Sequence, residues 1–329
     1  MLTPARNAAI EQFLSAAGWS GVEHRDLAGD ASTRRYQRLH AQTRSSVLMI
    51  DGEDGGQLPA FLAVQRILTD AGLSVPRVIT AAPGQGLALL EDFGDDTYTR
   101  LLDQGAAPLA LYRLAIDALR HVHACVDIDD PPVAALPRYG RDDWIDIVRL
   151  FADGYVAAHG QPPTATAVAE YEEIWHELLA RTDGFPKSLL LRDFHAGNLF
   201  HLPGRSGVAA CGLIDFQDAG VGSVLYDPIS LLEDARRDLE RDVFAECQMR
   251  FRASLPPHAP EDFEAAWSAL ALQRHLRVIA VFDRLARAGD DRYVAHLPRV
   301  WGYVEKHLRA PAAARLAAWL DRHLKSRLG

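Results

Sequence analysis

The sequence predicts a bilobal α+β protein, with a small β-rich lobe over residues 1–92 and a larger, mainly helical lobe over residues 93–329. Short runs with β character alternate with turn signals before residue 90. After residue 95, apolar residues recur mainly at spacings of three and four, as they do along one face of a helix. Strands followed by helices are typical of an α+β architecture.

The first lobe is expected to begin with a helix, because Thr3 is a favourable N-cap and Pro4 suits the first helical position. A second helix is expected over residues 58–71, with Gly72 ending it. The runs expected to form strands are VEHRDL (22–27), RRYQRLH (34–40), SVLMI (46–50), RVITA (77–81) and GLALLE (86–91).

The second lobe is expected to be helical apart from residues 188–216, where short β runs interrupt the pattern. Its helices are expected at residues 108–125, 142–157, 164–181, 261–287 and 311–326.

Composition restricts the classes of function. The chain is 48% hydrophobic and 24% charged, which is typical of a globular protein with a sizeable core. A formal net charge of −9 argues against a nucleic-acid-binding surface and favours a small-molecule partner. No apolar run approaches the roughly 18 residues of a membrane span, so a cytoplasmic location is expected. Three widely separated cysteines indicate neither a disulfide framework nor a zinc knuckle.

Polar residues with the chemistry of a phosphoryl-transfer site lie between apolar runs. Asp193 and Asn198 are five residues apart in SLLLRDFHAGNLF. Asp215, at the end of a strand-like run, follows Asp193 by 22 residues, a separation that suits a hairpin bringing both acids together. Magnesium prefers oxygen ligands, which Asp215 and Asn198 supply. Asp193 is then left to accept a proton from an attacking hydroxyl.

The Asp-x4-Asn element and the following IDF resemble the catalytic loop and metal-binding aspartate of the protein-kinase-like fold, in the version used by aminoglycoside phosphotransferases. Further segments resemble the bacterial cell-wall-recycling kinases that phosphorylate the anomeric hydroxyl of N-acetylmuramate and N-acetylglucosamine. These segments are LAGDASTRRYQRL (27–39), LLEDFGDDTY (89–98), LPRYGRDDW (136–144), YDPISLL (226–232) and LQRHLRVIAVFDRLAR (272–287).

This resemblance implies roles for particular residues. Asp193 corresponds to the catalytic base, and Asn198 and Asp215 correspond to the magnesium ligands. The backbone from Glu91 to Phe93 corresponds to the adenine-binding hinge. The turn at 29–34 corresponds to the loop that covers the phosphates, in which Ser32, Thr33 and Arg34 are the candidate contacts.

The chain departs from the family pattern in the β-rich lobe. Met49 stands where the family has a phosphate-binding lysine, and no glutamate occurs in the following helix between residues 57 and 71. In the family these two residues form an ion pair, and here both are absent. Their joint absence is physically consistent, since either charge buried alone would be costly. Arg34 or Arg35 is therefore expected to contact the phosphates. The sequence does not assign a role to His195.

Two further regions allow more than one interpretation. Arg274, His275 and Arg277 lie in an arginine-rich helix that either lines the sugar pocket or presents a solvated or lobe-packing face. Asp227 is favoured as a structural residue, because it precedes Pro228 and would suit a helix N-cap.

The leading hypothesis is an ATP- and Mg2+-dependent kinase that phosphorylates the anomeric hydroxyl of an N-acetylated amino sugar in peptidoglycan recycling. One alternative is a kinase of another small alcohol, such as an aminoglycoside. The other is a catalytically silent nucleotide-binding regulator, which the missing lysine would fit and the retained Asp193, Asn198 and Asp215 oppose.

Overall fold

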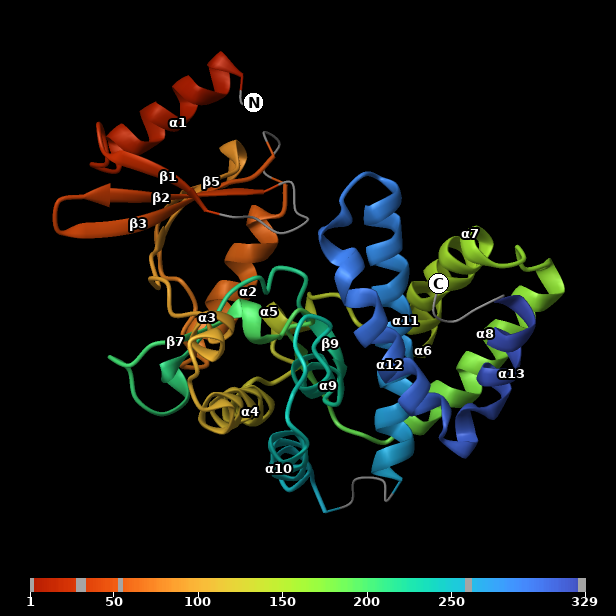
Figure 1. Ribbon diagram of the computed structural model, residues 1–329. Helices are drawn as coiled ribbons and strands as arrows, with labels where there is room; N and C mark the ends of the chain where they lie inside the picture. Colours follow the sequence, from red (N-terminus) through yellow and green to blue (C-terminus); the bar gives the residue numbers. More distant parts are fainter. Residues whose placement is uncertain (1–2, 28–33, 53–55, 258–261, 325–329) are drawn as a thin grey trace. The chain divides into compact units, whose positions relative to one another are not determined.

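The computed structural model describes residues 3–27, 34–52, 56–257 and 262–324 (Figure 1). The chain forms two compact units. The first comprises Met1–Cys125 with Ala196–Ala219, and the second comprises Val126–His195 with Gly220–Gly329. This division rests on compactness alone, so the expected functional lobes at 1–92 and 93–329 stay a prediction.

The first unit contains a five-stranded sheet in the order β1-β2-β3-β5-β4, with every neighbouring pair antiparallel. All five runs predicted as strands form strands, and turn signals separate them in the sequence. The strands are β1 (Glu23–Leu27), β2 (Arg35–Ala41), β3 (Arg44–Ile50), β4 (Val78–Ala82) and β5 (Leu87–Glu91).

Helix α1 (Pro4–Ala16) covers one face of this sheet (Figure 1). Its predicted cap is confirmed, since the Thr3 side chain accepts a hydrogen bond from the backbone N–H of Arg6 at 3.1 Å. The helix and the sheet share a hydrophobic core composed of Ile10, Leu14, Trp19, Leu39, Leu48, Ile50, Leu87 and Leu89.

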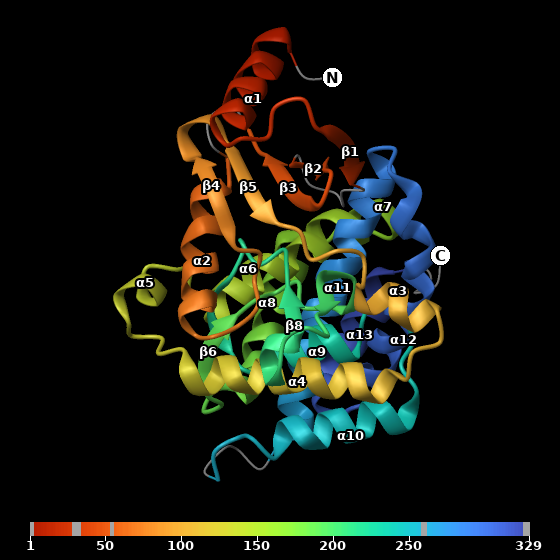
Figure 2. The same cartoon turned by 90° about the vertical axis from the view of Figure 1, so that its left-hand side faces the viewer.

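Helix α2 (Leu58–Asp70) lies near β4 and β5 in the view of Figure 2. Gly72 follows it with φ +78°, which confirms the predicted helix end. The first unit also holds a small antiparallel sheet of β7 (Leu199–His201) and β8 (Cys211–Leu213). Its remaining helical elements are α3 (Tyr98–Asp103), α4 (Pro108–Cys125) and the short 3-10 turns η1 (Pro83–Gln85), η4 (Ala196–Asn198) and η5 (Gly207–Ala210).

The second unit is mainly helical, with one two-stranded antiparallel sheet of β6 (Lys187–Leu190) and β9 (Gly220–Ser223). Every helical region predicted here is present, although residues 151–156 form a π-helical turn inside the expected 142–157 helix. Helices α10 and α12 were not predicted. The helices are α5 (Pro131–Ala134), α6 (Arg141–Leu150), α7 (Ala157–His159), α8 (Ala165–Leu179), α9 (Tyr226–Leu232), α10 (Arg241–Arg252), α11 (Phe263–Arg287), α12 (Leu297–Leu308) and α13 (Ala314–His323).

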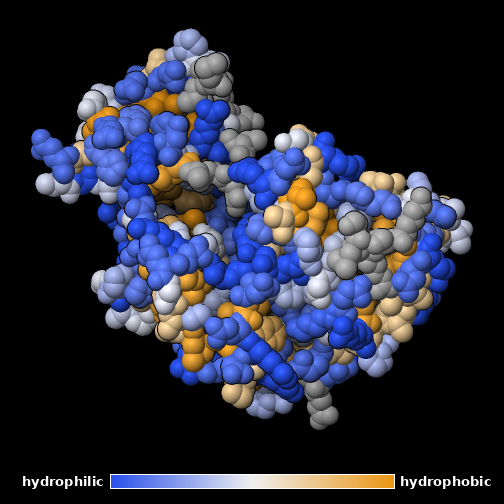
Figure 3. Space-filling view, viewed as in Figure 1, coloured by the Kyte–Doolittle hydropathy of each residue, from blue (hydrophilic) through white to orange (hydrophobic). Residues whose placement is uncertain are grey.

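Short turns complete this unit, namely the π-helical η2 (Phe151–Val156) and the 3-10 turns η3 (Ala180–Thr182), η6 (Asp291–His296) and η7 (Pro311–Ala313). The face seen in Figure 3 is mainly hydrophilic, with only small scattered apolar areas. Across the described residues, none of the helices combines the length and apolar character that a membrane span requires.

Candidate active site

Asp193 lies in a sharply turned loop after strand β6 of the second unit. Its backbone N–H donates a hydrogen bond to the carbonyl of Leu191 at 2.9 Å, so the chain reverses within three residues. Arg192, the middle residue, has φ +67°, in the left-handed region that non-glycine residues rarely adopt. Such a conformation costs on the order of 1–3 kcal/mol and persists only where the surroundings hold it.

Asp227 holds this loop. Its side chain is fully buried, and its two carboxylate oxygens accept hydrogen bonds from the backbone N–H groups of Leu191 at 2.7 Å and Arg192 at 2.9 Å. Burial raises the pKa of Asp227 to about 7, although these two hydrogen bonds act to lower it. The structural role is therefore confirmed, while the predicted cap is wrong: Leu225 is the N-cap of α9, and Asp227 lies in the first turn.

A second contact holds the loop from the same helix. The hydroxyl of Ser230 donates a hydrogen bond to the carbonyl of Arg192 at 3.2 Å and accepts one from Nη2 of Arg274 at 2.8 Å. Arg274 is only 4% exposed. Arg274, a candidate sugar-binding residue, therefore contacts Ser230 and through it supports the backbone of the loop that carries Asp193.

We expect Asp227→Ala to reduce both stability and turnover. The buried N–H of Leu191 would lose its acceptor, at a cost of about 1–3 kcal/mol, the part-buried N–H of Arg192 would lose its own, and the loop that carries Asp193 would lose its support. Urea unfolding and steady-state kinetics measure the two effects. Asp238→Ala is the control, because Asp238 forms an ion pair with Arg299 and its side chain is 77% exposed. Wild-type turnover in Asp227→Ala would contradict a positioning role.

Arg277 lies near Asp193 in the second unit. Burial alone would lower the pKa of Arg277, but the nearby Tyr226 hydroxyl and Asp193 carboxylate raise it above its ordinary value. Tyr226 stacks on Trp144 with ring centroids 4.8 Å apart, and Trp144 stacks in turn on Tyr139 at 5.0 Å. A guanidinium and an aromatic stack thus accompany the predicted base.

Tyr139 connects this aromatic stack to the catalytic loop. Its hydroxyl accepts a hydrogen bond from Arg192 at 2.7 Å, and the Arg192 guanidinium lies 4.7 Å from the centre of the Tyr139 ring. Sequence reasoning did not identify Tyr139 as a site residue. The signal available was its position in LPRYGRDDW, one of the segments that carry the family resemblance.

Two histidines considered from the sequence are buried. His195 is 3% exposed, and burial lowers its pKa, so its imidazole is neutral inside the second unit. His275 is fully buried and its Nε2 lies 2.7 Å from a carboxylate oxygen of Glu233. Each therefore contacts protein groups within the unit.

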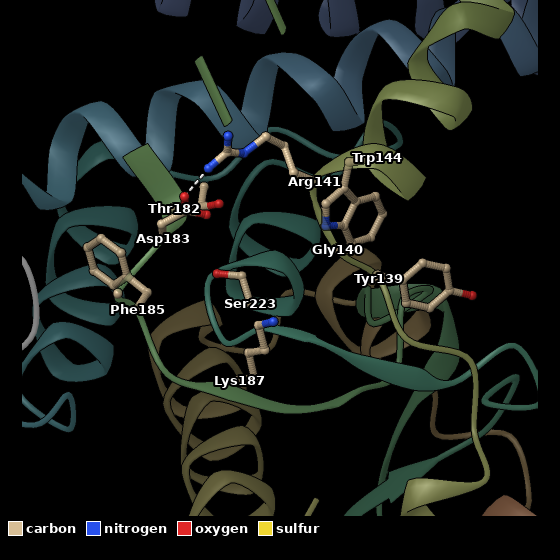
Figure 4. A pocket seen from close by; sticks show the side chains of 10 residues that line it. Tyr139, Gly140, Arg141, Trp144, Thr182, Asp183, Phe185, Lys187 and Ser223 are labelled. Atoms are coloured by element: carbon tan, nitrogen blue, oxygen red, sulfur yellow. Dashed lines mark hydrogen bonds and ion pairs between the residues drawn. The ribbon is translucent and has the colours of Figure 1, made fainter. Parts of the chain in front are cut away.

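A pocket of about 290 Å³ opens in the second unit (Figure 4). Arg141 and Asp183 form an ion pair across part of it, and Tyr139 and Trp144 form one wall. The pocket includes Lys187, which begins strand β6. Asp193 lies beyond the other end of that strand, three residues after Leu190. We therefore do not assign this pocket to the phosphoryl acceptor.

The predicted metal ligands lie in the first unit. The β7–β8 hairpin brings Asn198 and Asp215 together, with Nδ2 of Asn198 3.4 Å from Oδ2 of Asp215. The sequence predicts a hairpin that brings Asp193 and Asp215 together. The β7–β8 hairpin is present between Asn198 and Asp215, but Asp193 lies in the second unit, so the meeting of the two acids stays a prediction. Asp215 has φ +61° and accepts further hydrogen bonds from Arg34 and Gln217, at 3.0 and 3.1 Å. The amide N–H groups of Asn198 and Gln217 face this carboxylate. A carboxylate with a neighbouring side-chain amide can supply the oxygen ligands that magnesium prefers.

The side chain of Arg34 is buried and that of Arg35 is exposed, as expected for successive residues at the start of a strand, which point to opposite faces. Arg34 is 5% exposed and donates hydrogen bonds to Asp215 and, at 2.7 Å, to Gln217, whereas Arg35 is exposed. Met49 is fully buried and pairs with Tyr36 and Ala88 in the sheet. A cationic side chain thus lies beside the predicted metal ligand even though the strand lacks a lysine.

Glu91 ends strand β5, and Phe93 follows it in the first unit. The Phe93 ring packs edge-on against Phe200, with ring centroids 5.7 Å apart. A Cβ on Gly212 would lie 2.9 Å from the Phe93 ring, so only glycine at this position permits the packing. Ser32 and Thr33, the other predicted nucleotide contacts, lie outside the described residues.

Comparison with known proteins identifies the family. The model of the phosphotransferase enzyme family matches residues 23–253, which is more than half of the chain. The chain belongs to this family. It is a small-molecule kinase, as the sequence motifs predicted, and Asp193, Asn198 and Asp215 all lie within the matched region.

Curated relatives match the phosphotransferase along nearly its whole length. The N-acetylmuramate/N-acetylglucosamine kinase of Caulobacter vibrioides is 35% identical, and the match covers 98% of each chain. The kinase of the same name from Pseudomonas aeruginosa is 32% identical, with 94% of this chain and 92% of the relative covered.

Solved structures show the fold. A choline/ethanolamine kinase family protein from Mesorhizobium loti has a TM-score of 0.63 and 16% identity, covering 96% of this chain and 99% of its own. The ADP-bound aminoglycoside phosphotransferase APH(2'')-Ib has a TM-score of 0.61 and 16% identity, covering 94% and 98%. The phosphotransferase therefore has the protein-kinase-like fold that its motifs implied.

Proposed function

We propose that the enzyme transfers the γ-phosphoryl group of ATP to the anomeric C1 hydroxyl of N-acetylmuramate, N-acetylglucosamine or both. The observation that carries the proposal is the likeness, over 98% of the chain, to a kinase named for those two sugars. Asp193, Asn198 and Asp215 support it, because they supply the base and the oxygen ligands that phosphoryl transfer requires.

The adenine is proposed to bind beside Glu91 and Phe93. Among the described residues, the backbone N–H of Phe93 has no hydrogen-bond partner, so it is available to a ring nitrogen of the base. The Phe93 and Phe200 rings offer an apolar surface to the purine. Ser32, Thr33 and Arg34 are proposed to contact the phosphates.

Asp215 and Asn198 are the residues proposed to hold magnesium. Both present oxygen atoms, and they already lie together at the end of the β7–β8 hairpin. Magnesium bound there would neutralise part of the charge on the nucleotide phosphates. Arg34, which now pairs with Asp215, would add a charged donor to the same phosphates.

Asp193 is proposed to accept the proton of the C1 hydroxyl as its oxygen attacks the γ-phosphorus. The bond between that phosphorus and the bridging oxygen breaks, and ADP leaves with the bonding electrons. An anomeric hydroxyl is more acidic than an ordinary sugar alcohol, which reduces the demand on the base. The loop held by Asp227 and Ser230 fixes the position of this carboxylate.

Of the three residues of α11 considered from the sequence, Arg277 is the one we propose as a direct sugar contact. It is half-buried and lies near Asp193 and Tyr226, whereas Arg274 and His275 are 4% and 0% exposed. A guanidinium can pair with the carboxylate of the lactyl group in N-acetylmuramate or donate to an acetamido oxygen. Arg277→Ala should therefore affect turnover of N-acetylmuramate more than that of N-acetylglucosamine.

The proposed biological role is peptidoglycan recycling in the cytoplasm, where ATP is available. The product would be a sugar 1-phosphate, which is the class of compound that nucleotidyltransferases consume. A gene for such an enzyme beside that of this kinase would support the role.

The function is tested by measuring ADP release with N-acetylmuramate, N-acetylglucosamine and kanamycin as acceptors, with GTP replacing ATP in a parallel series. We expect turnover with one or both sugars, and phosphorus coupling to C1 in the NMR spectrum of the product. Turnover with kanamycin alone would instead indicate an aminoglycoside kinase. Nucleotide binding without turnover of any acceptor would support the silent regulator.

The absent strand lysine gives a second prediction. Arg34→Ala should lower the rate of transfer and raise the KM for ATP, by about 10-fold or more together, because hydrogen bonds to charged groups contribute about 1.5–3 kcal/mol. Arg34→Lys should restore only part of this loss, since an ammonium cannot make the bidentate contacts of a guanidinium.

Arg35→Ala is the matched control, because Arg35 is the adjacent residue and is exposed. Steady-state kinetics with varied ATP on the three variants decide the question. Unchanged ATP parameters in Arg34→Ala would mean that backbone groups and magnesium alone hold the phosphates.

A further inference from the structure

Three potential metal ligands converge inside the second unit: the carboxylate of Glu233 and the imidazoles of His275 and His307. Glu233 is the C-cap of α9, His275 lies in α11, and His307 lies in α12. Their ligand atoms all lie within 4.8 Å of one another. The three side chains are 1%, 0% and 4% exposed, so the cluster is enclosed by protein.

The two imidazoles turn the same ring nitrogen toward one carboxylate oxygen. Nε2 of His275 lies 2.7 Å from Oε2 of Glu233, and Nε2 of His307 lies 2.8 Å from the same oxygen. Zinc binds nitrogen and oxygen ligands at about 2.0–2.2 Å, so neighbouring ligand atoms in a tetrahedral site are about 3.3 Å apart. The two nitrogen–oxygen pairs reach that separation if each lengthens by about half an ångström.

Neighbouring groups orient the cluster. Nδ1 of His307 lies 3.1 Å from the hydroxyl of Ser268, and this contact leaves Nε2 facing Glu233. Metal-bound histidines commonly use the second ring nitrogen in this way. Lys306 places its ammonium 2.9 Å from Oε1 of Glu233 and 4.5 Å from the centre of the Phe244 ring, and its side chain is 52% exposed.

We propose that Glu233, His275 and His307 bind a divalent transition-metal ion, with zinc as the best match to two imidazoles and one carboxylate. These ligands are different residues from Asn198 and Asp215, and they use nitrogen where magnesium requires oxygen. Bound metal ties the end of α9 to α11 and α12. Because α9 carries Asp227 and Ser230, the metal stabilises the helix that holds the catalytic loop.

The test uses the full-length chain without an affinity tag, stripped with a chelator and titrated with zinc in a calorimeter. We expect one zinc per chain to survive gel filtration and to raise the Tm, since a ligand of the folded state alone stabilises it. Glu233→Gln, His275→Gln and His307→Gln should each bind zinc at least 10-fold more weakly. Ser268→Ala should lose roughly 10-fold through misorientation of His307. His40→Gln, an exposed histidine in β2, is the control.

Lys306→Ala separates this proposal from a metal-free network of buried hydrogen bonds. If the cluster binds metal, removal of the competing ammonium should tighten zinc binding severalfold. In a metal-free network the same substitution lowers stability and creates no zinc affinity. Lys306→Ala also keeps all three ligands, so it still tests the proposal if a ligand substitution prevents folding. A wild-type protein that retains no zinc and has the same Tm with and without it overturns the proposal.

Discussion

Asp193→Asn should lower turnover by about 10²-fold or more while leaving nucleotide affinity and folding unchanged. The substitution preserves size and the backbone turn but removes the group that accepts the hydroxyl proton, and positioned acid–base groups typically contribute 10²–10⁴-fold. Because the loop is held through backbone contacts to Asp227 and Ser230, the side-chain change leaves that support in place. The loss should therefore appear in kcat and kcat/KM equally.

Measurements of kcat, of nucleotide affinity by calorimetry and of urea unfolding are needed together for this variant. Asp70→Asn is a matched control, since Asp70 is 74% exposed at the end of α2. Near-wild-type turnover in Asp193→Asn, with that control also active, would rule out Asp193 as the base.

Asp215→Ala should reduce turnover by about 10³-fold or more, because a metal ion supplies several kcal/mol of charge stabilisation in phosphoryl transfer. It should also abolish the dependence of nucleotide affinity on magnesium. Asn198→Ala should have the same effects less completely, since a neutral ligand contributes less charge. Calorimetric titration with and without magnesium measures both.

Asp215→Asn controls for structure, because Asp215 also pairs with Arg34, whose side chain is 4% exposed. An asparagine keeps the shape of the side chain beside Arg34 and Gln217 while removing the charge. If wild-type nucleotide affinity proves equal with and without magnesium, the assignment of both ligands fails.

Most of the fold could be predicted from the sequence because its signals are local. Turn residues separate strands β1 to β5 in the sequence, Thr3 marks the start of one helix and Gly72 marks the end of another. Helices α10 and α12 were missed although the buried residues of each repeat at helical spacing, so the signal was present in the sequence. In α10 the stripe is narrow, with only Val243, Cys247 and Phe251 buried.

Candidate site residues can be predicted from the sequence where short motifs hold them. Asp193 and Asn198 share one such motif, and Asp215 lies in a second motif 17 residues after Asn198; their roles stay predictions. The residue that holds the loop before Asp193 could not be predicted in this way. A local rule assigns Asp227 to a helix cap, whereas its carboxylate accepts hydrogen bonds from the backbone of residues 191 and 192. Arg274 likewise acts through Ser230, a contact between residues 44 positions apart that periodicity alone does not reveal.

The pairing of strands also constrains the order in which a growing polypeptide acquires its structure. The hairpin of β7 and β8 closes between His201 and Cys211, while β6 and β9 meet only when Gly220 pairs with Leu190. Short closures cost less entropy than long ones, so the inner hairpin forms first. Asp227, which accepts hydrogen bonds from the backbone N–H groups of Leu191 and Arg192, comes still later in the chain. A nascent chain that has emerged from the ribosome only as far as Ala219 therefore carries Asp193, Asn198 and Asp215 but has nothing to hold Arg192 in its left-handed conformation.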